Sequence, residues 1–94
     1  MGMKQEIAEI RAMGMLAWLA AQDDLFPVFL GATGVSEGDV RARAGEVEFL
    51  ASVVDFVMMD DAWVIACAAD QGWPPQEIMA IRMALPGGDL PAWT

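Results

Sequence analysis

The chain has 94 residues and a formal net charge of −9, with 56% apolar and 20% charged residues. This length suits one domain, and the apolar content excludes a disordered chain. Proteins bind nucleic acids and anionic membranes through clustered Lys and Arg. The negative net charge of this chain therefore argues against both as partners. The basic residues are few, namely Lys4, Arg11, Arg41, Arg43 and Arg82.

The N-terminal segment does not resemble a signal peptide, because Glu6 and Glu9 stand where such a peptide is positively charged. A membrane-spanning helix needs about 20 consecutive apolar residues. Acidic residues interrupt every long apolar run, at Asp23, Asp24, Asp55, Asp60 and Asp61. We therefore expect a cytoplasmic protein that does not bind membranes.

Residues 3–22 are predicted to form the first helix, because apolar residues recur there at helical spacing. One face is lined by Met3, Ile7, Ile10, Gly14, Ala17 and Ala21, and the apolar surface is widened by Met13, Leu16, Leu19 and Ala20. Glycine costs a helix interior about 1 kcal/mol relative to alanine. The position of Gly14 on this face therefore suggests that another helix passes close to it.

Capping residues divide the next segment into two short helices. Asp23-Asp24 is expected to end the first helix and to cap a second over residues 25–33, which Gly34 terminates. Ser36 and Asp39 have the spacing of a capping box and predict a third helix that runs to about Ala44.

Residues 46–59 are apolar on nearly all sides and are predicted to form the core helix. A fifth helix follows over residues 62–71, capped by Asp60-Asp61 and ended by Gly72. A sixth begins at the prolines after Trp73 and runs to Leu85. We expect a single compact all-α domain of about six helices over residues 1–88, followed by a C-terminal tail over 89–94 in which Trp93 is the only anchor. The residues expected to be buried are Ile10, Ala17, Phe29, Val47, Leu50, Val54, Val57, Trp63 and Ile78.

Three acidic residues of the first half recur in the second half at a constant sequence distance. Glu9, Asp23 and Asp24 recur 37 residues later as Glu46, Asp60 and Asp61. Either the fold contains two related three-helix halves, or the preference for acidic residues at helix starts alone places them at the same spacing twice.

Few side chains offer catalytic chemistry. The chain has no His, and its single Cys67 lies among apolar residues, which favours a buried core thiol. The acidic pairs are interpreted as helix caps rather than cation sites. Asp55 lies within the core helix, where it either occupies a narrow solvent edge, pairs with one of the later arginines, or is a buried general base. We predict no enzyme activity, no catalytic residue, no metal and no cofactor, and no small-molecule substrate is identifiable.

A helix-turn-helix over residues 31–44, with Arg41 and Arg43, suggests DNA binding as an alternative. Glu37 and Asp39 would repel phosphate at the start of its second helix, so this alternative requires a basic stripe formed by Arg41, Arg43 and Arg82.

Four segments together resemble one protein family: 29–35 (FLGATGV), 39–44 (DVRARA), 49–56 (FLASVVDF) and 80–87 (AIRMALPG). The chain resembles the alphaproteobacterial domain of unknown function 3572 over nearly its whole length. Members of that family often carry Pro at the position of Glu37. The resemblance implies a small all-helical bacterial protein and supplies no activity, ligand or catalytic residue.

The high apolar content of so short a chain predicts an uncovered apolar patch. We expect an interaction module that forms a homodimer or docks a helix of a protein partner. The predicted interface lies on the first and core helices, around Met13, Leu16, Phe49, Val53 and Phe56.

Overall fold

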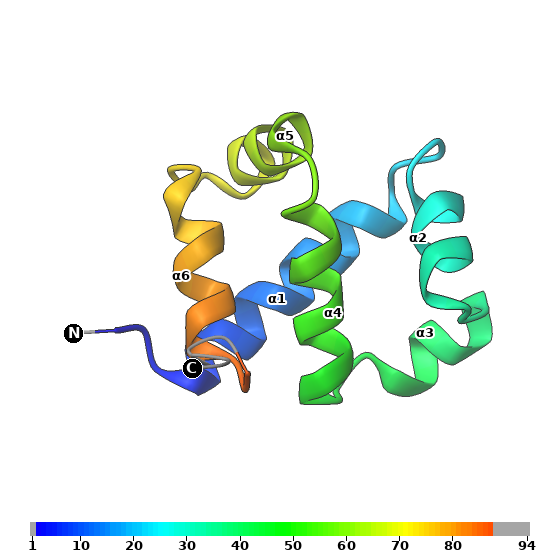
Figure 1. The fold of residues 1–94 in the computed structure, drawn as a ribbon, viewed down its shortest axis with the longest axis horizontal. Coiled ribbons are helices and arrows are strands. Elements are labelled where there is room, and N and C mark those ends of the chain that lie inside the picture. The colour runs from blue at the N-terminus through cyan, green and yellow to red at the C-terminus, as the bar shows by residue number, and fades with distance from the viewer. Residues whose placement is uncertain (1, 88–94) are drawn as a thin grey trace, which may run out of the picture.

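The computed structural model describes residues 2–87, which form six α-helices and no strand (Figure 1). The all-α prediction is confirmed. The predicted tail over 89–94, including Trp93, lies outside the described residues. In chain order the helices are α1 (Gln5–Ala20), α2 (Phe26–Thr33), α3 (Glu37–Arg43), α4 (Val47–Val57), α5 (Asp61–Gln71) and α6 (Gln76–Ala84).

Local sequence signals set four helix ends, namely the starts of α3 and α5 and the ends of α2 and α5. The Ser36 hydroxyl accepts a hydrogen bond from the Asp39 amide, and the Asp39 carboxylate accepts one from the Ser36 amide, each at 3.2 Å. This reciprocal pair is the predicted capping box. The Asp60 carboxylate accepts a hydrogen bond of 2.8 Å from the Ala62 amide and so caps α5. Gly34 and Gly72 end α2 and α5 with φ values of 75° and 80°, which glycine adopts without steric cost.

The predicted core helix is confirmed as α4, which crosses in front of α1 in Figure 1 and contacts α1, α5 and α6. Its solvent edge is narrow and consists of Glu48 and Asp55, with the half-buried Ser52 between them. Its buried side chains are Phe49, Leu50, Ala51, Val53, Val54, Phe56 and Val57. The apolar surface of α4 therefore faces protein on nearly all sides.

The buried face of α1 differs from the prediction. Ile10 is 68% exposed and Ala17 is also exposed, so the prediction that both are buried is wrong. The residues that pack against α4, α5 and α6 occupy the opposite side, and the fully buried ones are Ala8, Ala12, Met15 and Leu19. Because α1 carries apolar residues on all sides, their spacing does not indicate which side is covered.

The arm formed by α2 and α3 lies beside α4, on the side away from α6 (Figure 1). Phe29 of α2 is fully buried and makes edge-to-face contacts with Phe49 and Phe56 of α4, at centroid distances of 6.0 and 5.3 Å. Phe26 stacks on Phe29 at 6.3 Å. These aromatic contacts attach the arm to α4.

The two halves of the chain differ at their acidic turns. Asp60 caps α5, but the N-cap of α2 is Leu25, and no side chain caps that helix. The predicted capping of α2 by Asp23-Asp24 is therefore wrong. The Gln22 carbonyl instead accepts hydrogen bonds from the amides of Leu25 and Phe26, at 3.2 and 2.9 Å. A backbone turn thus satisfies donors that a carboxylate was expected to satisfy.

Candidate functional site

The side of α1 that faces away from the core carries an apolar strip. Ile7, Ile10 and Met13 are 41%, 68% and 42% exposed, and the small Ala17 is exposed as well. These positions are three or four residues apart, so they lie on one side of the helix. We call these four residues the free face of α1. None of α2 to α6 covers it within residues 2–87.

Most of the predicted interface residues lie elsewhere. Met13 belongs to the free face of α1, but the other four are buried in the core, with exposures of 7% for Leu16, 2% for Phe49, 0% for Val53 and 5% for Phe56. The predicted exposure of these four residues is wrong. Phe49 and Phe56 on the outer side of α4 are covered by Phe29 of α2. Ile7 and Ile10 share a face with Gly14, where another helix was expected to pass, and Ile10 was predicted to be buried. The sequence of α1 contains no pattern that shows which of its two apolar sides is buried.

Asp55 lies on the solvent edge of α4 and also pairs with an arginine. The Arg82 Nε donates a hydrogen bond of 2.6 Å to Asp55 Oδ1, and the Asp55 side chain remains 58% exposed. Arg82 Nη1 also donates to the Pro86 carbonyl at 3.1 Å. Two of the interpretations of Asp55 are thus confirmed together, and the buried general base is excluded. The pair joins α4 to the end of α6.

Arg43 and Arg11 also form ion pairs with acidic side chains. Arg43 forms an ion pair of 3.1 Å with Glu46, and its guanidinium lies 5.3 Å from the centre of the Phe49 ring. Arg11 pairs with Glu77 and lies over Trp73. Arg41 and Arg43 belong to α3, which lies on the opposite side of α4 from α6 and Arg82 (Figure 1). The stripe that the DNA-binding alternative requires is therefore not formed by these three residues.

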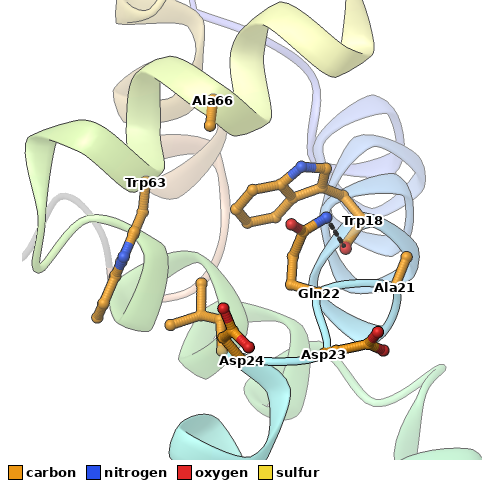
Figure 2. A pocket seen from close by; sticks show the side chains of 8 residues that line it. Trp18, Ala21, Gln22, Asp23, Asp24, Trp63 and Ala66 are labelled. Atoms are coloured by element: carbon orange, nitrogen blue, oxygen red, sulfur yellow. Dashed lines mark hydrogen bonds between the residues drawn. The ribbon is translucent and has the colours of Figure 1, made fainter.

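A cavity of about 510 Å³ opens where the end of α1 meets the start of α5. Trp18 and Trp63 stand on opposite sides of it, and Asp23, Asp24 and Gln22 lie along its lower rim in Figure 2. Its remaining lining residues are Ala21, Leu25 and Ala66. The lining contains two carboxylates and no basic side chain, so the local potential is negative.

Burial of Trp18 and ring stacking of Trp63 hold the aromatic walls of this cavity in place. Trp18 is only 8% exposed, and its backbone carbonyl accepts a hydrogen bond of 3.0 Å from Gln22 Nε2. Trp63 stacks on Phe56 with ring centres 5.0 Å apart and an interplanar angle of 19°. The cavity is therefore formed by side chains that the core already fixes.

Comparison with known proteins identifies the family. The sequence profile of the family described as "Protein of unknown function (DUF3572)" matches residues 5–88. The chain belongs to this family. The DUF3572 match includes all six helices, which confirms the resemblance seen in the sequence. No curated protein and no solved structure matches the chain. Membership of DUF3572 assigns no activity, so the function has to be argued from the surface and the cavity.

The single thiol of this DUF3572 member is chemically inert. Cys67 is fully buried, and burial raises the pKa of its thiol from the ordinary 9.0 to about 12, with a further contribution from the negative charge of Asp70. A thiol with this pKa stays protonated near neutral pH, and the thiolate is the reactive form. The predicted role of Cys67 as a small core residue agrees with this environment.

Residues 2–87 of the DUF3572 structure contain neither a metal-binding cluster nor a helix able to span a membrane. No three His, Cys, Asp or Glu side chains converge there in an arrangement that could hold a metal ion. None of the helices in the same residues has the length and apolar character needed to cross a bilayer.

Proposed function

We propose that this DUF3572 member is a non-catalytic interaction module that forms a homodimer through the free face of α1. The observation that carries the proposal is the exposure of Ile7, Ile10 and Met13 on one side of a helix whose other side is fully packed. Soluble monomers rarely leave contiguous apolar strips uncovered. A second copy of the chain can cover this strip without any other protein. Two-fold symmetric dimers are the commonest homo-oligomers.

The charge on this side of α1 favours an antiparallel pairing. Glu6 is exposed at the N-terminal end of the free face, whereas Ala17 at the other end carries no charge. A two-fold axis that crosses α1 near its middle would place each Glu6 beside the small C-terminal residues of the partner helix. Parallel pairing would bring the two carboxylates together, which is unfavourable. The proposed interface is therefore isologous, with Ile10 and Met13 near its centre.

The strength of the dimer follows from the size of this surface. Covering a half-exposed Ile or Met contributes about 1–2 kcal/mol, and two copies supply six such side chains. Association costs about 4–15 kcal/mol in lost translational and rotational freedom. Six side chains give about 6–12 kcal/mol, so with an association cost of about 4 kcal/mol the net gain is about 2–8 kcal/mol. This corresponds to a weak dimer whose dissociation constant is no tighter than about micromolar. Docking of a partner helix on the same face is the related possibility, and it would compete with self-association.

Sedimentation equilibrium over a concentration series tests the proposal. The wild-type mass should rise from 10.1 kDa toward twice that value at high micromolar concentration. Ile10→Lys should keep the chain monomeric. Ile65→Lys is the matched control, because Ile65 is 57% exposed but lies on α5, and it should dimerise like the wild type. Wild-type protein that stays at 10.1 kDa throughout, or dissociation by Ile65→Lys alone, would contradict the proposal.

A further inference from the structure

The outer side of α6 carries two exposed methionines. Met79 and Met83 lie one turn apart on the same side of this helix and are 57% and 55% exposed. Ile78 and Ile81 face the core and are fully buried. Figure 1 shows α6 on the side of α4 opposite the α2–α3 arm, so the arm does not cover these methionines. An apolar strip therefore lies along this edge of the molecule.

An apolar hollow adjoins each of the two methionines. The hollow beside Met79 has a volume of about 280 Å³ and lies where the end of α4 meets the starts of α5 and α6. The hollow beside Met83 has a volume of about 270 Å³ and lies between α6 and the residues that precede α1. Met58 lines the first hollow and Met3 the second, so four of the eight methionines of the chain gather here. Because Met side chains are flexible and adapt to a partner, a surface of this kind suits the apolar side of a docked helix.

The charges around the two hollows are unbalanced at the α5 end. Among residues 2–87, Asp61 is the only charged residue that lines either hollow, and Asp60 precedes it. Both carboxylates are exposed, and neither forms an ion pair within the same residues. The charged residues of α6, Glu77 and Arg82, already form ion pairs with neighbouring helices. The unmatched negative charge therefore favours a partner with cationic side chains at this end.

We propose that the outer side of α6 docks an amphipathic helix of another protein, with Lys or Arg gathered at one end of its apolar side. Two apolar side chains of that helix, three or four residues apart, enter the hollows beside Met79 and Met83. Its cationic end lies over Asp61. The reverse direction is disfavoured, because the exposed Lys4 follows Met3 at the other end. The free face of α1 is turned away from α6, so this surface is a second one and does not rest on the proposed dimer.

Three peptides of about 15 residues, the length at which an isolated helix begins to form in water, serve as probes. The first has Leu along one side of the helix and Lys near one end. The second has Glu in place of Lys. The third has the composition of the first in an order that leaves no apolar side. Each peptide is titrated into the full chain labelled with ¹³C at its Met methyl groups, and NMR follows the methyl signals.

The Lys peptide should shift the methyl signals of Met3, Met58, Met79 and Met83. The signal of Met13, on the free face of α1, should stay in place and serves as the internal comparison. The Lys peptide should also bind about fivefold more tightly than either of the other two peptides, because only this peptide offers both an apolar side and the matching charge.

Two double variants separate this surface from the free face of α1. Met79→Gln with Met83→Gln should weaken the Lys peptide about tenfold, because it removes the exposed apolar area while both half-exposed positions accept a polar side chain. The matched control is Ile10→Gln with Met13→Gln, which removes two exposed apolar side chains from α1. The control should leave peptide binding unchanged, although it should weaken the dimer.

A single variant tests the charge without altering the apolar strip. Asp61→Asn should weaken the Lys peptide about two- to fivefold, the range expected for one exposed ion pair. Glu48→Gln removes the same charge from the exposed edge of α4, outside both hollows, and should leave binding unchanged. Equal weakening by Asp61→Asn and Glu48→Gln, or equal binding of the Lys and Glu peptides, would contradict the proposed cationic partner.

Other results would assign the outer side of α6 to a different occupant and so overturn the inference. A shift of Met13 without shifts of Met79 and Met83 would place the peptide on the free face of α1. Signals of Met79 and Met83 that move with protein concentration, without peptide, would mean that a second copy covers them. A change of the Met83 signal in Trp93→Ala, again without peptide, would mean that the same chain covers it.

Discussion

Replacing Phe29 by Ala should release the α2–α3 arm while α1, α4, α5 and α6 stay folded. Phe29 is fully buried and is the residue through which α2 contacts Phe49 and Phe56. The remaining helices contact one another without the arm, because α1 contacts α4, α5 and α6, and these three also touch one another. Phe29 is the only buried residue of α2 and Val40 the only one of α3, so the arm has fewer buried side chains than α1 or α4.

The expected cost is large for a chain of this size. Removing a buried Phe side chain costs about 3–5 kcal/mol, and the two edge-to-face contacts place Phe29 at the upper end of that range. A domain of this length unfolds with a total free energy of about 5–14 kcal/mol. The loss at Phe29 is thus a large fraction of this total and falls on the contacts between the arm and α4, so the arm should open first.

Amide hydrogen exchange measured by NMR separates the two parts of the molecule. In Phe29→Ala the amides of α2 and α3 should lose protection, while the central amides of α1 and α4 keep most of theirs. Val28→Ala is the matched control, because the neighbouring Val28 is 52% exposed, and it should change exchange little. The reasoning is refuted if all six helices lose protection to the same extent, or if the two variants behave alike.

Three further predictions concern single residues. Asp60→Ala should lower the free energy of unfolding by about 1 kcal/mol because it removes an N-cap, whereas Asp24→Ala should change it by less than about 0.5 kcal/mol; chemical denaturation measures both, and equal losses would contradict the different roles of the two acidic turns. Gly14→Ala should stabilise the chain by up to about 1 kcal/mol, measured by thermal or chemical denaturation. A Cβ at this position would meet only the flexible end of the Gln71 side chain, at 2.7 Å from Oε1, and that end can move away. A loss of stability would mean that Gln71 cannot move. Stability should fall as the pH rises from about 9 to 12, by up to about 1.4 kcal/mol per pH unit, because in this window the Cys67 thiol ionises in the unfolded chain but stays protonated in the folded one. Cys67→Ala should reduce this dependence, and an unchanged pH profile would show that other groups cause it.

Features that depend on neighbouring residues were predictable from the sequence. The capping box at Ser36 and Asp39, the cap at Asp60 and the glycines that end α2 and α5 all act within a few residues, and each lies where it was predicted. The core position of α4 was predictable for a different reason. A helix that is apolar on nearly all sides is usually enclosed by its neighbours. The same reasoning did not show that Phe49, Val53 and Phe56, predicted as interface residues, are enclosed as well.

Features that depend on tertiary packing were not predictable. The two apolar sides of α1 look alike in sequence, and only the packing of α4, α5 and α6 decides that Ala8 and Ala12 are buried while Ile10 is exposed. The identical pairs Asp23-Asp24 and Asp60-Asp61 differ because a backbone turn at Gln22 replaces the cap in the first half. The cavity was missed because it joins Trp18 and Trp63 from separate halves of the chain.

The central claim is that two copies of this chain meet through the free face of α1, and an isotope-filtered NOE experiment tests it most directly. The sample mixes chains that carry ¹³C-labelled Ile and Met methyl groups with unlabelled chains, at high micromolar concentration. The account predicts intermolecular contacts from the methyl groups of Ile10 and Met13 to protons of α1 in the unlabelled chain. The exposed methyl groups of Met79 and Met83 on α6 provide the comparison, and they should give none. A spectrum without intermolecular contacts from Ile10 and Met13, or with contacts from the α6 methionines alone, would contradict the account.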